Sequence, residues 1–585
     1  MWLKGGVLSR SFFLQDDYAQ IAAAAHRAPS LGYLFQNHDG RFMPLGYAVT
    51  WLLTRFRPYD WGAATAVLLT LQGCASLALL RALRVMFGSR WAVLVPFALY
   101  AVTPLTMPAL GWYSAALSSL PSQAALAMAL AAHVRYLRRE RTTYLVQTVG
   151  WVVVGMLAGP KAAVIPVLAF AVTSAYFFTG TWAEAARAAW QRHTRMWWWQ
   201  LRALAALIVL YALSWIGAGT RDDLGGMDAD QVAGFAGRLL GQTFPLYFVG
   251  GPWRWAPNGE DYATPHPPDG QVLLALAVVV AVVWTSVRYR RVAYRAWLIL
   301  LGYLLVADVA PVVFGRAPRL GAFLGVDARY VADAAPVLAI CLALACTALA
   351  GEKEPYVRPM PAGVLLPGVA GLAGGAVVIA SVWCLDAYRD RLGGTQGRAF
   401  LVTARRELAR TPDLRTVFPD FVPTRMMDAS FGADRLTTRV LAPLLPASRL
   451  AELAHPRPTR HPLVLDAYGR LRPGAVFGTT GTPPPDGSGC WKLGALPRMI
   501  TLAKPLRVAD YVVAVGYLAS KPARVEVRYG QGGVARAAFT VRPKYGRFTF
   551  ALHGGGAALA TTRLSGPGRV CVTDVAVGYA VPAAR

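Results

Sequence analysis

Ten apolar runs separated by polar loops are the feature that most constrains how this chain can fold. They cover residues 61–80, 91–112, 115–134, 144–157, 162–178, 203–217, 272–286, 296–314, 331–350 and 364–385. A helix needs about 20 mostly apolar residues to cross the hydrocarbon core of a bilayer. Hydrophobic residues make up 55% of the chain, which argues against a soluble enzyme. The sequence therefore predicts an α-helical polytopic membrane protein with about ten visible spans.

Arginine residues concentrate in every second loop of this pattern. They are Arg81, Arg84 and Arg90 after the first run, Arg135, Arg138, Arg139 and Arg141 after the third, Arg187, Arg192 and Arg195 after the fifth, and Arg288, Arg290, Arg291 and Arg295 after the seventh. The positive-inside rule places these loops in the cytoplasm and the alternate loops outside. The same rule accounts for the net charge of +28, so we expect no nucleic-acid partner.

An acidic pair, Asp16 and Asp17, lies among aromatic residues ahead of the first run. Two adjacent carboxylates beside a membrane surface are costly unless they hold something. The simpler interpretation is that they begin a helix over residues 18–26. Residues 43–53 are apolar but only about half the length of a span, which predicts an interfacial helix.

An even number of spans places the acidic pair and the C-terminal region on the same, outer face. Residues 1–10 are too short and too polar to span, and they lack the apolar core of a signal peptide. We therefore expect that a preceding helix is missing, which would make eleven spans. Two alternatives stay open: residues 144–157 are not a span, or the N-terminal segment inserts from the outside.

Three parts are expected along the chain. Residues 1–390 form the membrane domain, with external loops at 11–60 and 218–271, and residues 391–461 form a connecting region of helices and turns. From about residue 462, short strands alternate with turn signals, which predicts a β-sandwich over residues 462–585.

Three motifs resemble the GT-C class of polytopic membrane glycosyltransferases, which take a sugar from a polyprenyl phosphate. The first is Asp16-Asp17-Tyr18, because an acidic residue in the first external loop is the usual catalytic base of that class. The second is the turn Gly159-Pro160-Lys161-Ala162, and the third is Arg329-Tyr330 followed by Pro336. The resemblance covers about residues 11–390, and the absent first helix is its chief departure.

The resemblance implies a role for each of these residues. Transfer from a sugar phosphate needs a base for the acceptor hydroxyl and cations for the leaving phosphate. Asp17 or Asp16 would be the base, with Lys161 and Arg329 at the phosphate. Further candidates are the supporting cations Arg316, Arg319 and Arg41, and His38, Asp39 and Tyr330 near the acceptor. The default alternative for Lys161 and Arg329 is a snorkelling anchor at a helix end, and for His38 and Asp39 a polar turn.

The resemblance leaves the cofactor open and suggests a purpose for the C-terminal region. Some members of the class require a divalent cation, which Asp16 and Asp17 could bind, but no third ligand is identified. The expected sandwich is similar to the carbohydrate-binding domains of some actinobacterial arabinosyltransferases. Aromatic residues there could stack on sugars, although they are more often core; they are Trp491, Tyr511, Tyr517, Tyr529 and Tyr545. A disulfide between Cys490 and Cys571 is expected if this region faces an oxidising compartment.

The implied function is transfer of a sugar from a polyprenyl-phosphate donor to a cell-envelope glycan or glycolipid acceptor, on the outer face of the cytoplasmic membrane. Two other functions stay open. A lipid-linked oligosaccharide transporter or polymerase would depend on the intramembrane acid Asp308. A non-catalytic scaffold would only display the C-terminal glycan-binding domain.

Overall fold

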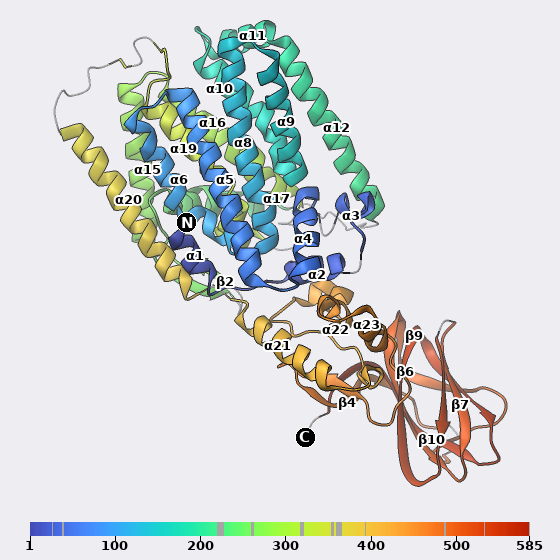
Figure 1. The fold of residues 1–585 in the computed structure, drawn as a ribbon. Helices are drawn as coiled ribbons and strands as arrows, with labels where there is room; N and C mark the ends of the chain where they lie inside the picture. The colour runs from blue at the N-terminus through green and yellow to red at the C-terminus, as the bar shows by residue number, and fades with distance from the viewer. Residues whose placement is uncertain are drawn as a thin grey trace. The chain divides into compact units, whose positions relative to one another are not determined.

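The computed structural model describes residues 1–25, 27–37, 40–218, 227–258, 262–315, 321–352, 356–357, 365–391, 393–484, 487–531 and 533–583. The chain divides into two compact units (Figure 1). The helical unit comprises Met1–Gln20 and Arg27–Gly394. The C-terminal unit comprises Ile21–His26 and Thr395–Arg585.

Seven helices in the described part of the helical unit are long and apolar enough to cross a membrane. They are Trp61–Phe87, Trp91–Leu110, Tyr113–Arg139, Thr194–Trp215, Asp269–Tyr289, Ala293–Phe314 and Gly371–Arg389. Three shorter apolar helices are Thr142–Ala158, Pro160–Tyr176 and Ala334–Cys346. Together these helices overlap all ten apolar runs, so the prediction of an α-helical membrane domain is confirmed. How many of the three shorter helices cross the membrane stays a prediction.

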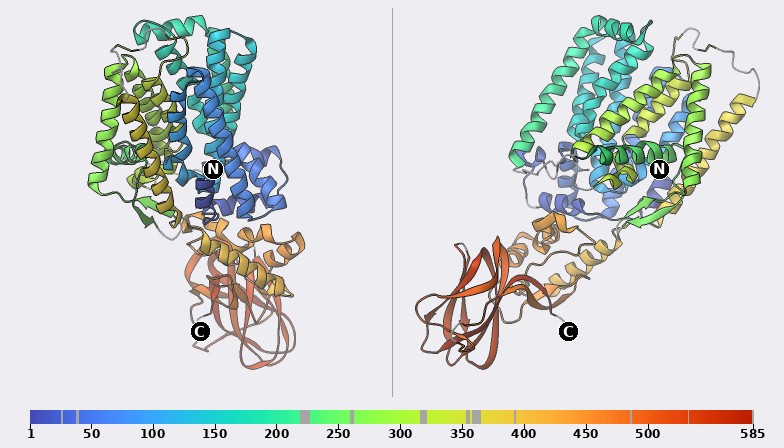
Figure 2. Two further views of the ribbon diagram at one scale, coloured as in Figure 1. Left: turned by 60° about the vertical axis from the view of Figure 1, so that its left-hand side comes forward. Right: turned by 180° about the vertical axis from the view of Figure 1, so that it is seen from behind.

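The long helices run alongside one another in each view of the unit (Figure 2). Helix α8 (Tyr113–Arg139) packs between α5 (Trp61–Phe87) and α9 (Thr142–Ala158). In the most apolar 18-residue stretch of α8, 67% is buried inside the protein, against 39% in the corresponding stretch of α5. Helix α8 is therefore a central helix of this unit.

The other elements of this unit complete the bundle and its connections. The helices are α1 (Trp2–Leu8), α2 (Asp16–Ala25, which continues into the C-terminal unit), α3 (Leu31–Leu34), α4 (Pro44–Phe56), η1 (Trp91–Val93), α6 (Leu94–Val102), η2 (Pro104–Thr106), α7 (Met107–Leu110), η3 (Pro160–Val164), α10 (Ile165–Tyr176), α11 (Trp182–Arg192), α12 (Thr194–Ala218), α13 (Ala229–Arg238), η4 (Leu239–Thr243), α14 (Phe244–Phe248), α15 (Asp269–Tyr289), α16 (Ala293–Tyr303), η5 (Leu304–Val309), α17 (Ala310–Gly315), η6 (Ala322–Val326), η7 (Ala328–Tyr330), α19 (Ala334–Cys346) and α20 (Leu365–Arg389). Strands β1 (Trp255–Asn258) and β2 (Tyr262–Pro265) form an antiparallel pair. The expected short helix at residues 43–53 is α4, which begins with Pro44 in its first turn, where proline is tolerated.

The C-terminal unit contains one eight-stranded sheet, preceded by short helices. The helices are α21 (Thr395–Arg410), η8 (Leu414–Thr416), η9 (Ala429–Arg435), α22 (Thr437–Val440), η10 (Ala442–Leu444) and α23 (Ala447–Ala454). The strands are β3 (Leu463–Leu465), β4 (Leu471–Thr480), β5 (Trp491–Lys492), β6 (Arg498–Ala519), β7 (Ala523–Tyr529), β8 (Gly533–Phe539), β9 (Arg542–Ser565) and β10 (Val570–Pro582). Their order is β3-β4-β10-β6-β9-β7-β8, with β5 paired to β10, and all of these pairs are antiparallel.

The β domain expected from about residue 462 is present, but two of its strands are much longer than the short strands that were expected. Strands β6 and β9 are 22 and 24 residues long and remain paired through three register shifts, of which two lie near Leu506 and Ala509. Opposite these shifts stands Gly554-Gly555-Gly556, where a Cβ on Gly555 would come 2.7 Å from the backbone nitrogen of Val508. Glycine therefore allows the two long strands to bend together, so one continuous sheet encloses the core that two sheets would otherwise share.

Aromatic residues fill that core. Tyr517 stacks on Phe539 with ring centroids 4.0 Å apart, and Phe539 stacks on Phe548 at 5.3 Å. Of the five aromatic residues that the sequence offered for sugar stacking, four are buried and only Tyr545 is exposed, at 52%. Cys490 and Cys571 form a disulfide, so the expected pair is joined in the structure.

We expect the Cys490→Ser/Cys571→Ser double variant to lower the free energy of unfolding of the C-terminal unit by about 2–5 kcal/mol. The disulfide joins residues 81 apart, and closing a long loop restricts the unfolded chain. Thermal unfolding of the full chain with and without reductant measures the effect. The Cys346→Ser variant, which removes an exposed free thiol, should keep the wild-type response; wild-type unfolding that ignores reductant would contradict the prediction.

Candidate active site

Asp17 fastens the start of α8 to the turn that precedes α2. The backbone N–H of Leu14 donates to Asp17 Oδ2, and that of Ser114 donates to Oδ1, each at 2.9 Å. Ser114 is the second residue of α8, and the residue before that helix, Trp112, provides no side-chain cap. The first N–H groups of a helix lack partners within it, so Asp17 supplies the missing acceptor from a distant segment.

Asp17 is completely buried. Its burial, together with the negative charge of Asp16, raises the pKa of Asp17 to about 7, against the opposing effect of the two N–H groups. Because each carboxylate oxygen accepts a backbone N–H, the structure gives Asp17 a positioning role at the start of α8. The capping interpretation of the acidic pair thus applies to Asp17, although the helix that it caps is α8.

Asp16 contacts the side chains of its neighbours, whereas Asp17 accepts hydrogen bonds from backbone N–H groups. The indole N–H of Trp112 donates to Asp16 Oδ1 at 2.7 Å, and the hydroxyl of Ser114 donates to Oδ2 at 2.9 Å. The guanidinium of Arg41 lies 2.6 Å from the same Oδ2. Asp16 is only 4% exposed, so this buried carboxylate is paired with a cation and held by two neutral donors, as a buried charge requires.

Arg329, which is far from Asp16 in the sequence, contacts the same indole. Its guanidinium carbon lies 3.7 Å from the ring centroid of Trp112, over the ring face that attracts cations. Its Nε donates to both oxygens of Asp327, at 3.0 and 2.8 Å, and a second nitrogen also contacts Asp327. Trp112 therefore joins Asp16 at its N–H edge to Arg329 at its face, which brings two of the expected residues together.

Lys161 lies beside the Arg329 turn but is already engaged. Its ammonium donates to Asp308 Oδ1 at 2.7 Å and to the carbonyl oxygen of Tyr330 at 2.6 Å, and it lies 3.2 Å from Asp333 Oδ2. An ammonium has three donors, and three acceptors surround this one. The expected phosphate contact of Lys161 would therefore require one of these acceptors to leave.

A chain of buried polar groups continues from Asp333 into the bundle. It runs from Asp333 through Ser119, Gln123, Tyr100 and Gln72 to Lys4. Lys4 is 2% exposed and also donates to Thr106 at 2.8 Å. Buried polar groups in a lipid-facing bundle are expensive, so this connected set is a second feature that a function has to explain.

The structure places the remaining candidates unevenly. His38, Asp39, Arg316 and Arg319 lie outside the described residues. Tyr330 contributes its backbone carbonyl. Among the described residues, no group of three or more His, Cys, Asp or Glu side chains has an arrangement that could hold a metal ion.

Sequence reasoning missed Trp112, Ser114 and the two acids that hold the cations, Asp327 and Asp333. Trp112 ends an apolar run, where a tryptophan ordinarily indicates an interface anchor. Both acids lie inside the Asp327–Pro336 stretch, so their closeness to Arg329 was the available signal.

The comparisons with known proteins add little to this geometry. No family model matches the chain. No curated protein matches it either. Among solved structures, one match is the crystal structure of ArnT from Cupriavidus metallidurans in the apo state, with 13% identity, 78% of this chain and 83% of that chain covered, and a TM-score of 0.40. At that score the likeness supports no argument about the site.

The raised pKa of Asp17 predicts how stability depends on pH. The folded protein holds the Asp17 proton more tightly than the unfolded chain, whose carboxyl has its ordinary pKa of 3.8. Stability should therefore fall as the pH rises from about 4 to about 7, by up to about 1.4 kcal/mol per pH unit from this group. The Asp17→Asn variant lacks this titration, so the thermal midpoint of the wild type should fall more than that of the variant between pH 5 and pH 8. Parallel profiles for the two proteins would contradict the prediction.

Proposed function

We propose that this chain is a membrane glycosyltransferase that moves a sugar from a polyprenyl-phosphate donor to a cell-envelope glycan or glycolipid acceptor on the outer face of the cytoplasmic membrane. One observation carries the proposal: Asp16 is paired with Arg41 and accepts the indole N–H of Trp112, and the face of the same indole contacts Arg329. A buried carboxylate with one guanidinium beside it and a second on the neighbouring indole supplies both the base and the positive charge that transfer from a sugar phosphate requires.

Asp16, in preference to Asp17, is the proposed base. The hydrogen bonds from Trp112 and Ser114 hold its carboxylate in place. The third partner, at Oδ2, is the long side chain of Arg41. We propose that the donor phosphate takes Arg41 as its partner and so releases Asp16 Oδ2 to the acceptor hydroxyl. An apo structure need not show the catalytic hydrogen bond in its final form.

The proposed reaction then balances as a single displacement. The acceptor hydroxyl gives its proton to Asp16, and its oxygen forms a bond to the anomeric carbon. The bond between that carbon and the phosphate oxygen breaks, and polyprenyl phosphate leaves with its new negative charge beside Arg41 and Arg329. Arg329 is pre-positioned for this step because Asp327 holds it through two hydrogen bonds from Nε, so little side-chain freedom is lost when the donor binds.

The C-terminal unit is proposed to position the acceptor glycan outside the cell. Its disulfide supports this location, since disulfides persist in oxidising compartments. Its sheet leaves Tyr545, Tyr468 and Tyr579 exposed at 52%, 65% and 40%, and exposed aromatic rings can stack on sugars.

The proposal predicts that Asp16→Asn lowers the rate of transfer by about 10²–10⁴-fold, because the base is lost. The donor is first identified by mass spectrometry of lipids extracted with the purified protein, and transfer of its labelled sugar is then followed. The Glu184→Gln variant, altered in the exposed cap of α11, serves as the control that should keep full activity. Undiminished transfer by Asp16→Asn, at a temperature where the variant is folded, would remove Asp16 as the base.

A lipid-linked oligosaccharide transporter is the second candidate, favoured by one observation. The buried group of Lys161, Asp308 and Asp333 continues as a polar chain to Lys4, and ionisable residues inside a helical bundle often mark a transport pathway.

Replacement of Asp308 separates the two candidates. For a transferase, we expect Asp308→Asn to lower the thermal midpoint, because removing one charge of a buried pair costs about 3–5 kcal/mol, while transfer at permissive temperature stays within about tenfold of wild type. Activity and unfolding of the purified variant measure both effects. A transport assay in proteoliposomes follows a labelled lipid-linked oligosaccharide across the bilayer. Transport by the wild type but not by the Asp308→Asn variant, with no sugar transfer by either protein, would favour the transporter.

A further inference from the structure

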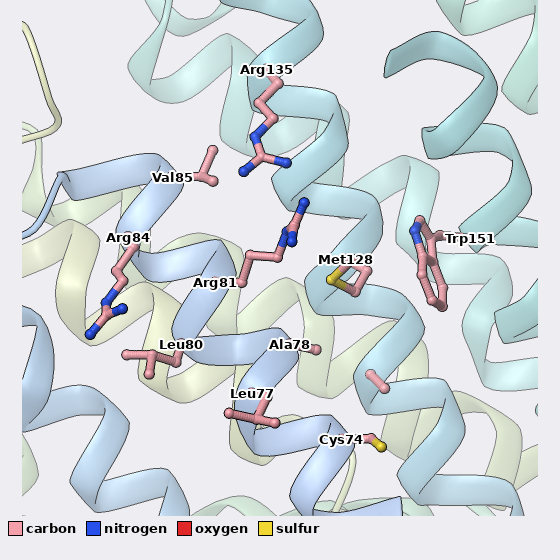
Figure 3. Close-up of a pocket in the computed structure, with 11 residues that line it drawn as sticks. Cys74, Leu77, Ala78, Leu80, Arg81, Arg84, Val85, Met128, Arg135 and Trp151 are labelled. Atoms are coloured by element: carbon pink, nitrogen blue, oxygen red, sulfur yellow. The ribbon is translucent and has the colours of Figure 1, made fainter. Parts of the chain in front are cut away.

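A groove of about 700 Å³ lies between α5, α8 and α9, away from the candidate active site (Figure 3). Ser114 and Arg135 are 21 residues apart on α8, which corresponds to about 32 Å along a helix. The arginine end of the groove is therefore separated from the acidic pair by about the thickness of a hydrocarbon core.

The groove has an apolar wall and a cationic end. Leu77 and Ala78 of α5, Met128 of α8 and Trp151 of α9 line the wall. Three arginines, Arg81, Arg84 and Arg135, line the same groove. Figure 3 shows the side chains of Arg81 and Arg135 directed toward each other from the two neighbouring helices, with Arg84 on the other side of α5.

The Arg81 and Arg135 charges repel each other. The charged neighbours that act on Arg135 are Arg81 and Arg139, with the hydroxyl of Tyr144, and no carboxylate is among them in the described part of the chain. By contrast, Arg138, three residues along α8 from Arg135, donates to the backbone carbonyl of Met86 at 3.0 Å. Two facing guanidiniums without an acid are unfavourable unless an anion lies between them.

The position of the arginines along α5 matches the depth of a lipid headgroup. Arg81 is the 21st of the 27 residues of α5, which places it about 30 Å from the start of the helix. That length equals the hydrocarbon thickness of a bilayer. The apolar wall extends from Arg81 back toward Cys74, into the depth that acyl chains occupy.

We propose that this groove binds one anionic phospholipid of the cytoplasmic leaflet. Its phosphate lies between Arg81 and Arg135, and one acyl chain lies along Leu77, Met128 and Trp151. The combination of two facing arginines and an apolar wall fits an amphiphile with a negative head. A free phosphate would leave the wall uncovered, and a zwitterionic lipid would leave the net positive charge unbalanced. The site is independent of the proposed transfer reaction.

Native mass spectrometry of delipidated, purified protein tests the proposal with phosphatidylglycerol and phosphatidylcholine of identical chains. We expect the wild type to bind the first phosphatidylglycerol at least about tenfold more tightly than phosphatidylcholine, because both arginines attract an anionic headgroup. The Arg81→Gln/Arg135→Gln variant should bind both lipids alike. The charge-matched control, Arg187→Gln/Arg195→Gln, changes exposed arginines outside the groove and should keep the wild-type preference.

A second variant addresses the acyl-chain part of the groove without changing charge. Ala124→Trp fills space beside the wall and should weaken the first phosphatidylglycerol while both arginines remain. Equal loss of preference in the groove variant and the charge-matched control would reduce the effect to diffuse attraction and overturn the proposal. Equal binding of the two lipids by the wild type would overturn it as well, and so would unchanged binding by Ala124→Trp. Thermal midpoints verify that each variant is folded.

Discussion

The candidate site depends on the way in which Ser114 separates two adjacent carboxylates. Its backbone N–H binds Asp17 and its hydroxyl binds Asp16. Neighbouring carboxylates repel each other, so they need separate partners if both are to stay near the start of α8. This division of partners turns Asp17 toward the backbone and leaves Asp16 facing Arg41. The cap that orients α8 and the carboxylate that faces the cations are thus consequences of one residue.

The three cations around this point are each held by an acid in the described structure. Arg41 is paired with Asp16, Arg329 with Asp327, and Lys161 with Asp308. Buried charges require partners, so such pairing keeps the site folded before a ligand arrives. An anionic donor would exchange partners with one of these acids and would meet cations already free of bulk water. Of the three cations, Arg41 could most simply exchange its acid for an anionic ligand, because Asp16 would keep its hydrogen bonds from Trp112 and Ser114.

Prediction from the sequence succeeded where a single physical property repeats along the chain. Apolar runs located the helices of the membrane domain, because burial in lipid requires apolar residues over a known length. Strands were expected from about residue 462, and the first strand of the C-terminal sheet, β3, begins at Leu463. The expectation of short strands was wrong for β6 and β9, because their bends near Gly555 look like turns in the sequence, although pairing continues through them. A glycine cluster alone does not show whether a strand ends or bends.

For the site, the sequence by itself determined which charged residues lie outside the apolar runs, and resemblance selected Asp16, Arg41 and Arg329 among them. Only the tertiary structure decided that Asp17 is a cap, that Lys161 is enclosed by acceptors, and that Trp112 joins Asp16 to Arg329. The reason is physical. Hydropathy and charge decide whether each residue favours lipid or water, so their pattern can be read along the chain. A hydrogen bond between Asp16 and Trp112 joins residues 96 apart, and its existence depends on how the helices pack.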